Sequence, residues 1–262
     1  MEIGLGEIER MVAQLLLPLF RVAAMLMTMP VFGTQLVPVR ARLGLALAIT
    51  FVLVPVIPPV PVSSGLALDT WLLILEQMLI GGVLGFTLYI LMETFTVGGQ
   101  LIANQMGLGF ASMTDPANGT SVVVLGQFYL MMVMLLFLAM DGHLVIIETL
   151  AMSFQLLPIG GGGLELSSLW RIVLAGGWLF SAAILMALPA ITALLVVNFA
   201  FGIMTKAAPQ LNIFAIGFPF TMVLGIFIVW ASLGGFLGQY AGFAERVLEL
   251  ITSVIREAAR HG

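Results

Sequence analysis

The sequence contains no cysteine and very little charge. Its 262 residues include nine Lys/Arg, thirteen Asp/Glu and two His, so that charged residues make up only 8% of the chain. The absence of cysteine excludes a disulfide framework, a thiolate metal site and a cysteine nucleophile. The net charge of −4 argues against nucleic acid as a partner, because nucleic-acid binding needs a basic surface.

The sequence is rich in apolar residues. They make up 61% of the chain, and the mean hydropathy is +1.18, whereas a soluble domain has about 45–50% apolar and about 25% charged residues. So little polar surface cannot cover a water-exposed exterior. Because segments of about 20 apolar residues cross a bilayer as helices, the composition predicts an all-α integral membrane protein.

Charges and prolines divide the chain into apolar segments that we expect to be helical. The first lies on either side of Arg21 and breaks near Pro30, and the second ends near Val54 because prolines follow it. The expected segments are 11–39, 43–54, 71–105, 122–140, 172–205 and 207–244. The last two are longer than one membrane crossing requires.

The chain from about 236 to 260 has the pattern of an amphipathic helix. Its apolar positions recur at spacings of three and four residues, and charged residues occupy the other face. The apolar set is Tyr240, Phe243, Val247, Leu248, Ile251, Val254, Ile255 and Ala258, and the charged set is Glu245, Arg246, Glu249, Arg256 and Glu257. The pattern fits a helix on a membrane surface as well as one packed on partner helices.

Basic residues do not give one consistent membrane topology. Arg40 and Arg42 place the first loop inside and the N-terminus outside by the positive-inside rule. Five crossings then put Lys206 inside, and a sixth leaves the basic C-terminal tail outside. Counting 142–157 as a further crossing moves the conflict to Lys206. Either so few charges give a noisy signal, or some apolar helices face protein instead of lipid.

Small residues at spacings of four predict close contacts between helices. The pattern occurs at Gly81 and Gly85, and again at Gly234, Gly238 and Gly242. Such patterns are common in membrane proteins, so neither identifies a particular partner helix.

Enzyme chemistry, cofactors and metals are not predicted. The chain has no GxxxxGK[ST], HExxH or GxSxG motif. His143 has only Asp141 near it at metal-ligand spacing, and His261 lies in the charged tail.

Ionisable residues inside apolar sequence are functional candidates, because their burial is costly. Four residues qualify: Glu76, Glu93, Glu148 and Lys206. The first three also fit helix ends at the level of the headgroups. Lys206 lies between two charge-free runs, so it either extends to water or pairs with a carboxylate, including one from another chain.

Three sequence phrases resemble a known family. They are Pro30-Val-Phe-Gly33 with the segment 37–42, the segment 98–111 followed by Asp115-Pro116, and the segment 198–214 with Gly217-Phe-Pro219. In content and order they resemble the FliR/SpaR/YscT family, the R subunit of the export gate in flagellar and virulence type III secretion. The resemblance covers essentially the whole chain.

The resemblance implies an architecture. Residues 1–170 would be a P-subunit-like helical region, and residues 171–262 a Q-subunit-like helical hairpin that turns at 206–209 and ends in the amphipathic helix. The chain would assemble with P-type and Q-type subunits into a helical pore complex. In this family much of the assembly lies above the bilayer plane, which would account for the inconsistent topology.

The resemblance also implies a function. The chain would be a structural subunit of the flagellar type III export gate in the bacterial inner membrane, at the flagellum basal body. Its partners would be other membrane subunits of the flagellar export apparatus, membrane lipid, and the unfolded flagellar proteins that pass through for flagellum assembly.

The loop near 107–121 would then be a pore plug. Gly107 and Gly109 provide a flexible backbone, and the apolar Leu108, Phe110 and Met113 form a stopper that blocks ions and yields to an unfolded chain. The other residues of the expected plug are Ala111, Ser112, Asp115 and Pro116. Lys206 would make an intersubunit polar contact, and Gly202, Pro209 and Pro219 would shape the hairpin turn and bends.

Other functions stay open at this point. A virulence export gate shares the three phrases, and the preference for a flagellar gate rests on overall similarity. A stand-alone secondary transporter or channel would have broken helices around a midplane site, and the chain does contain Pro and Gly breaks. A membrane-embedded enzyme is disfavoured for want of an acid–base pair or a metal site.

Overall fold

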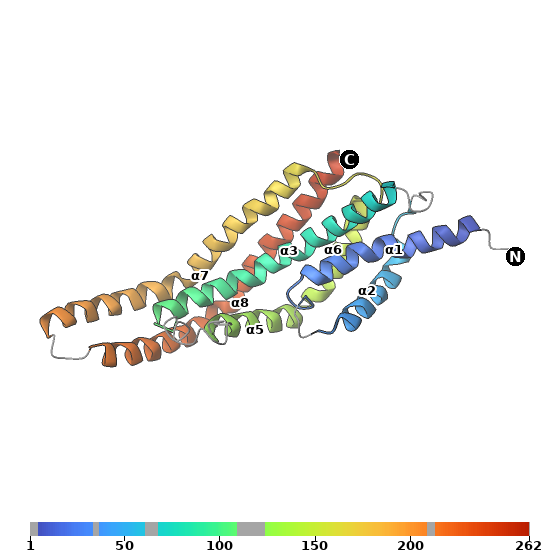
Figure 1. Ribbon diagram of the computed structural model, residues 1–262. Coiled ribbons are helices and arrows are strands. Elements are labelled where there is room, and N and C mark those ends of the chain that lie inside the picture. The colour runs from blue at the N-terminus through green and yellow to red at the C-terminus, as the bar shows by residue number, and fades with distance from the viewer. Residues whose placement is uncertain (1–4, 34–36, 61–67, 109–123, 209–212, 262) are drawn as a thin grey trace. The chain divides into compact units, whose positions relative to one another are not determined.

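The computed structural model describes residues 5–33, 37–60, 68–108, 124–208 and 213–261, and every regular element in them is helical (Figure 1). The elements are α1 (Leu5–Thr28), α2 (Val39–Leu53), η1 (Val54–Val56), α3 (Leu68–Gln105), α5 (Val124–Ala139), α6 (Gly142–Leu156), α7 (Leu166–Ala207) and α8 (Ile213–His261). Five of these helices are long and apolar enough to cross a membrane. The prediction of an all-α integral membrane protein is confirmed.

Proline determines several helix boundaries, as predicted. Helix α1 ends at Thr28, shortly before Pro30, and α2 ends at Leu53, where Val54 and Pro55 begin a short 3-10 turn. Helix α2 starts directly after Pro38. Prolines inside α1, α7 and α8 do not end those helices.

Helices α5 and α6 are joined by a sharp bend of 70°. Asp141 between them adopts the left-handed conformation with φ 55°. Gly142 follows, where a Cβ would meet the ring of Phe137. Helix α6 has 15 residues, a length of about 22 Å, which is too short to cross a hydrocarbon core of about 30 Å alone. By length and composition, the pair is a broken span or a re-entrant hairpin, and the alternative of a separate crossing over 142–157 stays a prediction.

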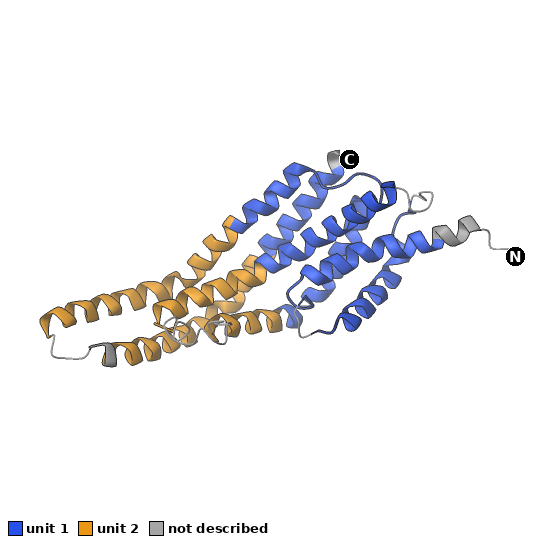
Figure 2. Cartoon of the chain, viewed as in Figure 1, with its two compact units in different colours: residues 1–90, 137–176, 245–262 blue, residues 91–136, 177–244 orange. Residues whose placement is uncertain are grey.

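Contacts divide the chain into two compact units, which Figure 2 shows in different colours. Unit 1 contains residues 1–90, 137–176 and 245–262, and unit 2 contains residues 91–136 and 177–244. Helices α3, α7 and α8 each contribute residues to both units. This division follows contacts, whereas the expected boundary near residue 170 follows likeness to other subunits and stays a prediction.

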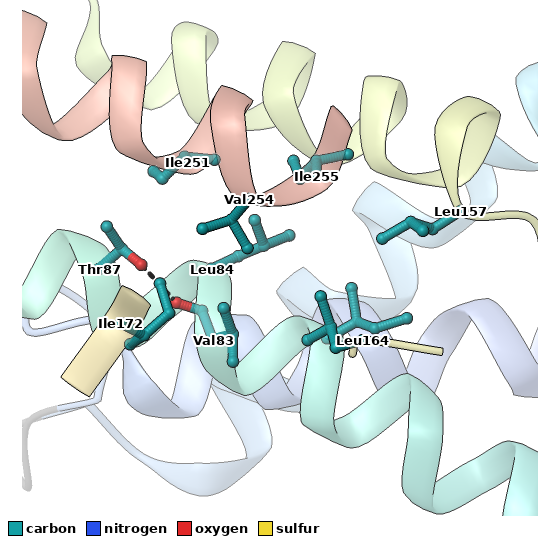
Figure 3. A pocket seen from close by; sticks show the side chains of 10 residues that line it. Val83, Leu84, Thr87, Leu157, Leu164, Ile172, Ile251, Val254 and Ile255 are labelled. Carbon is teal, nitrogen blue, oxygen red and sulfur yellow. Dashed lines mark hydrogen bonds between the residues drawn. The ribbon is translucent and has the colours of Figure 1, made fainter. Parts of the chain in front are cut away.

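In unit 1, the apolar face of the C-terminal part of α8 packs on other helices of the same chain. Val247, Ile251 and Val254 are buried. Residues of this face, with Leu84 of α3 and Ile172 of α7, line a small apolar cavity of about 10 Å³ (Figure 3). The predicted amphipathic helix is confirmed, although it is the continuation of α8 and not a separate element.

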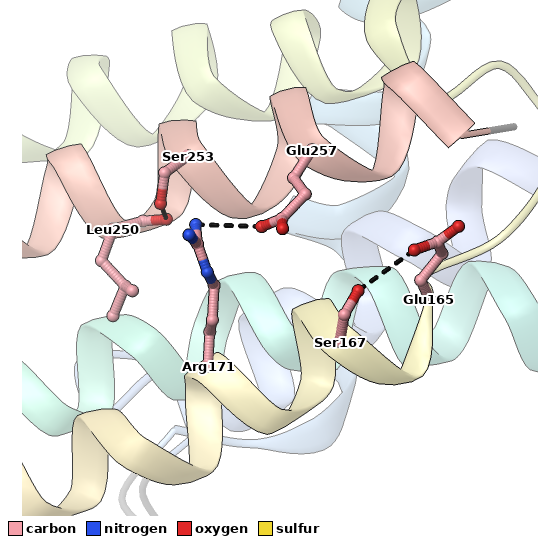
Figure 4. A network of polar contacts seen from close by, with 6 residues as sticks. All are labelled: Glu165, Ser167, Arg171, Leu250, Ser253 and Glu257. Carbon is pink, nitrogen blue, oxygen red and sulfur yellow. Dashed lines mark hydrogen bonds and ion pairs between the residues drawn. The ribbon is translucent and has the colours of Figure 1, made fainter.

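The polar side of the same helix carries an ion pair in unit 1. Arg171 of α7 lies 2.9 Å from Glu257 of α8 (Figure 4). Both side chains are partly exposed, so the pair contributes at most about 1 kcal/mol to stability.

Unit 1 also contains a buried cation in the middle of α1. The Arg21 side chain is fully buried. It donates to Gln77 Oε1 of α3 at 2.8 Å, to the Ser153 carbonyl of α6 at 2.9 Å and to the Leu157 carbonyl just beyond α6 at 2.9 Å. Its guanidinium lies 4.2 Å from the ring centroid of Phe154. Arg21 therefore joins three helices.

Candidate functional site at the base of the 107–121 loop

Helix α3 ends in unit 2 at a turn that only a residue with positive φ can make. Gly107 has φ 85°. The N–H of Leu108 donates to the carbonyl of Ala103, and the N–H of Gly107 donates to the carbonyl of Asn104, both at 3.0 Å. These two bonds form a Schellman motif, in which a left-handed glycine satisfies carbonyls that a helix end leaves free.

Side chains from α7 and α8 bind the next two carbonyls, that of Gln105 at the end of α3 and that of Met106 directly after it. Asn198 of α7 donates its Nδ2–H to the Gln105 carbonyl at 3.2 Å. The Thr221 hydroxyl of α8 lies 3.4 Å from the Met106 carbonyl. The four successive carbonyls of residues 103–106 therefore have hydrogen-bond partners. Such partners are needed because a helix end leaves carbonyls free and an apolar environment offers no water to bind them.

Close packing holds the same turn. The Met106 side chain is buried, and a Cβ at Gly225 of α8 would collide with it. A Cβ at Gly107 would lie 2.8 Å from the ring of Phe218. Nearby, Phe201 of α7 and Phe220 of α8 pack edge to face with ring centroids 5.6 Å apart. The loop therefore starts from a fixed base.

An aromatic cluster in unit 2 holds the part of α3 that precedes this base. Phe95 of α3 packs against Phe236 and Phe243 of α8, with ring centroids 5.2 and 5.4 Å apart. Tyr129 of α5 packs on Phe236 at 5.6 Å. A Cβ at Gly99 would lie 2.7 Å from the Tyr129 ring. These contacts fix α3, α5 and α8 to one another within the unit.

Gly107→Ala tests the conformation of the base. An alanine would have to adopt positive φ and displace the Phe218 ring, so we expect a loss of about 1–2 kcal/mol of unfolding free energy. Thermal unfolding in detergent measures the change. Gly202→Ala in α7 is the control, because a Cβ there meets nothing within 4 Å; equal losses for the two variants would contradict the expectation.

Comparison with known proteins identifies the family. Residues 12–247 match the model of a family described as bacterial export proteins, family 1. The chain belongs to this family. The similar proteins named flagellar biosynthetic protein FliR include one from Escherichia coli strain K12, which is 39% identical over 242 residues, or 92% of each chain. The resemblance to the FliR family is confirmed.

Other relatives of this export protein have the same name. A FliR from Pectobacterium carotovorum is 36% identical over 94% of this chain and 92% of the relative. One from Aquifex aeolicus is 30% identical over 86% of this chain and 87% of the relative. The similarity thus extends over nearly the full length in each comparison.

The structure describes only part of the expected plug of this FliR-family chain. Gly107 and Leu108 form the loop base. The remaining plug residues lie outside the described residues: Gly109, Phe110, Ala111, Ser112, Met113, Asp115 and Pro116. Their role stays a prediction.

The expected hairpin residues of the chain lie at and near the end of α7. Lys206 is exposed in the last turn of α7, which ends at Ala207, and α8 begins at Ile213. In the described part of the chain Lys206 makes no ion pair. Gly202 is exposed within α7, and Pro219 is exposed within α8, while Pro209 lies outside the described residues.

Sequence reasoning missed the roles of Asn198 and Thr221 at the loop base. Asn198 is a strongly polar side chain within the long apolar run of α7. Its isolation among apolar residues could have indicated that it binds a polar group. No group of three or more His, Cys, Asp or Glu side chains suited to a metal occurs among the residues that the structure describes.

Proposed function

We propose that this FliR-family chain is the structural R subunit of a flagellar type III export gate. The observation that carries the proposal is 39% identity to a flagellar biosynthetic protein over 92% of both chains. The relatives named above are flagellar, which favours the flagellar over the virulence system. The chain would lie in the bacterial inner membrane at the flagellum basal body.

The partners in this proposal are P-type and Q-type subunits and other membrane subunits of the export apparatus. Residues 1–170 correspond to the P-like region and residues 171–262 to the Q-like hairpin. The exposure of Lys206 near the hairpin turn leaves its ammonium available to a carboxylate of a neighbouring subunit. Pairing would offset the cost of placing this charge among apolar surfaces.

Apolar exposure on the hairpin supports assembly with other subunits. Phe199 of α7 is 70% exposed and Trp230 of α8 is 66% exposed. Side chains of this size need lipid or protein cover. Glycines of α7 and α8 with open space at Cβ, such as Gly202 and Gly238, allow a neighbouring helix to approach closely.

The plug mechanism depends on the contrast between the loop base and the loop itself. The base has carbonyls with hydrogen-bond partners and a buried Met106, whereas the sequence of the loop is rich in Gly, Ser and Thr. Irregular backbone at membrane depth is tolerated where it is buried in protein or lines a cavity. A loop of this composition can block ions and still give way to an unfolded polypeptide.

Purification from the native bacterium tests the assembly. The tagged chain would be extracted in mild detergent and its co-purifying proteins identified by mass spectrometry. Recovery of small hydrophobic P-type and Q-type subunits in excess over this chain is the expected result. A lone monomer or homodimer, under conditions that preserve other membrane complexes, would exclude the gate and favour a stand-alone transporter.

Shortening the loop tests the plug. Deletion of residues 110–114 leaves Gly107 and Leu108 in place, and we expect it to let ions leak through the assembled gate. A membrane-potential dye in cells that produce all gate subunits measures the leak. Deletion of residues 62–66, in the proline-rich connector before α3, is the control. A deletion variant that assembles normally and stays tight to ions would count against a plug.

A further inference from the structure

The outward side of α6 is polar, which is unusual in this apolar chain. On the inward side, Leu150 and Phe154 are buried in unit 1. Asp141, Glu148 and Gln155 are exposed, and they follow one another at intervals of seven residues, or about two helical turns. Three polar side chains therefore form one line along the outside of the helix, opposite its buried side.

Glu148 is the residue of this line that most limits its surroundings. It lies in the middle of α6 (Gly142–Leu156), and not at a helix end, where a short side chain could reach the headgroups. Its neighbours one turn away on the same side, Leu144 and Met152, are apolar, and α6 contains no Lys or Arg that could neutralise the carboxylate. A carboxylate in this position does not suit the acyl chains of lipid.

Exposed faces of other helices have a different character. Leu43, Leu47 and Phe51 of α2 are exposed at spacings of four residues, so that face needs lipid or protein cover. The charged side of α8 carries both signs, as in the adjacent Glu245 and Arg246, so its charges can neutralise one another. The outward face of α6 combines two carboxylates and an amide without a basic residue, and water is the surrounding that suits it.

The form of α6 points to the same surrounding. A 70° bend that contains Asp141 joins it to α5, so the pair has the form of a broken span or a re-entrant hairpin. Such a break at membrane depth is tolerated where the chain is buried in protein or lines a water-filled cavity. The buried side of α6 meets the first condition, and its polar side meets the second.

We propose that the outward face of α6 lines the water-filled passage of the export gate and that the exported polypeptide moves along it. Carboxylate and amide groups exchange hydrogen bonds between water and the backbone of a passing chain. Apart from Leu144, which is 54% exposed, the face offers little apolar surface to which that chain would adhere. The inference rests on the proposed function as a gate subunit and assigns a hydrated polypeptide as the partner of this face.

Single cysteines test the surroundings of the face. The chain has no cysteine, so an introduced one is its only thiol. Glu148→Cys and Gln155→Cys are produced in cells with all gate subunits, and a membrane-impermeant maleimide is supplied to spheroplasts and to inverted membrane vesicles. We expect both variants to react at least about tenfold faster than Leu185→Cys in α7, because the reactive thiolate forms in water and not in apolar surroundings.

The controls separate water in the assembled gate from exposure of the single chain. Leu185 is 65% exposed in the chain, but its apolar face needs lipid or protein cover in the membrane. Leu150→Cys, on the buried side of α6, should also react slowly. Gln155→Cys removes no charge, so it decides the test if Glu148→Cys fails to co-purify with P-type and Q-type subunits.

A stalled substrate distinguishes the passage from other water-exposed surfaces. A flagellar export substrate fused to a tightly folded domain would block the gate, and we expect it to slow the reaction of Glu148→Cys and Gln155→Cys severalfold. The same substrate without the folded domain passes through, so it should leave both rates nearly unchanged.

Two results would overturn the inference. A reaction as slow as that of Leu185→Cys would mean that lipid or a partner subunit covers the face. A fast reaction that the stalled substrate does not slow would mean that the face meets water outside the passage. With P-type and Q-type subunits still co-purifying, both results leave the proposed gate function intact, whereas failure of the unmodified chain to co-purify with them contradicts that function itself.

Discussion

Arg21→Leu is expected to lower the free energy of unfolding by about 3–5 kcal/mol. The substitution removes a buried cation and leaves four acceptor atoms behind: Gln77 Oε1, Ser153 Oγ and the carbonyl oxygens of Ser153 and Leu157. Each buried acceptor without a donor costs about 1–3 kcal/mol. The loss of packing against the Phe154 ring adds to the effect. Helices α1, α3 and α6 would lose their shared contact.

Chemical unfolding in detergent, with tryptophan fluorescence as the signal, measures this loss. Arg171→Leu is the matched control, since its ion pair with Glu257 is partly exposed and contributes at most about 1 kcal/mol. Arg21→Lys should remain strongly destabilised, because an ammonium lacks the planar fork that reaches acceptors on two helices. Similar losses for Arg21→Leu and Arg171→Leu would contradict the importance of the buried network.

Gly81→Ala is expected to destabilise unit 1 by about 3 kcal/mol. A Cβ at Gly81 would overlap the backbone carbonyl oxygen of Arg21. A backbone atom cannot rotate away as a side chain can, so α1 and α3 would have to separate. Separation would also stretch the bond from Arg21 to Gln77.

The adjacent glycine provides the control for this prediction. A Cβ at Gly82 meets nothing within 4 Å, so Gly82→Ala should be neutral, or stabilising by up to about 1 kcal/mol through helix propensity. The same unfolding measurement compares the two variants. A stabilised Gly81→Ala protein would mean that α1 does not approach α3 at this glycine.

Helix positions were predictable because their causes are local. The end of α2 before Pro55 and the end of α3 before Gly107 follow from the chemistry of single residues. The apolar face of the last part of α8 follows from the spacing of Val247, Ile251 and Val254. Neither result requires knowledge of a distant partner.

Contacts between distant residues were not predictable in the same way. Arg21 looked like a charge between two apolar runs, whereas its partners lie 56 to 136 positions away. The glycine pattern at Gly81 marks a tight helix contact, but the same pattern at Gly234 and Gly238 faces open space in the described structure. The spacing of small residues permits another helix to approach closely but does not identify which helix this is.

At the candidate site, too, the contacts between residues distant in the sequence could not be predicted. Gly107 was predicted as a flexible residue of the plug, whereas the structure gives it the left-handed conformation of a residue that ends a helix. The contribution of Asn198 depends on which carbonyl of α3 lies beside it. Asn198 and Gln105 are 93 positions apart, so the sequence does not show that they are neighbours.

The lengths of α7 and α8 have a consequence for the life of the chain in the cell. With 42 and 49 residues, their helical contours are about 63 and about 74 Å, at least twice the hydrocarbon core of about 30 Å. The charge-free parts of these helices, 172–205 of α7 and 213–244 of α8, are still about 51 and about 48 Å long, which is more than lipid alone can cover. Copies made without partner subunits would expose this apolar surface to water, which favours aggregation and removal by chaperones and proteases. Cellular quality control would thereby keep the abundance of this chain in step with that of its partners.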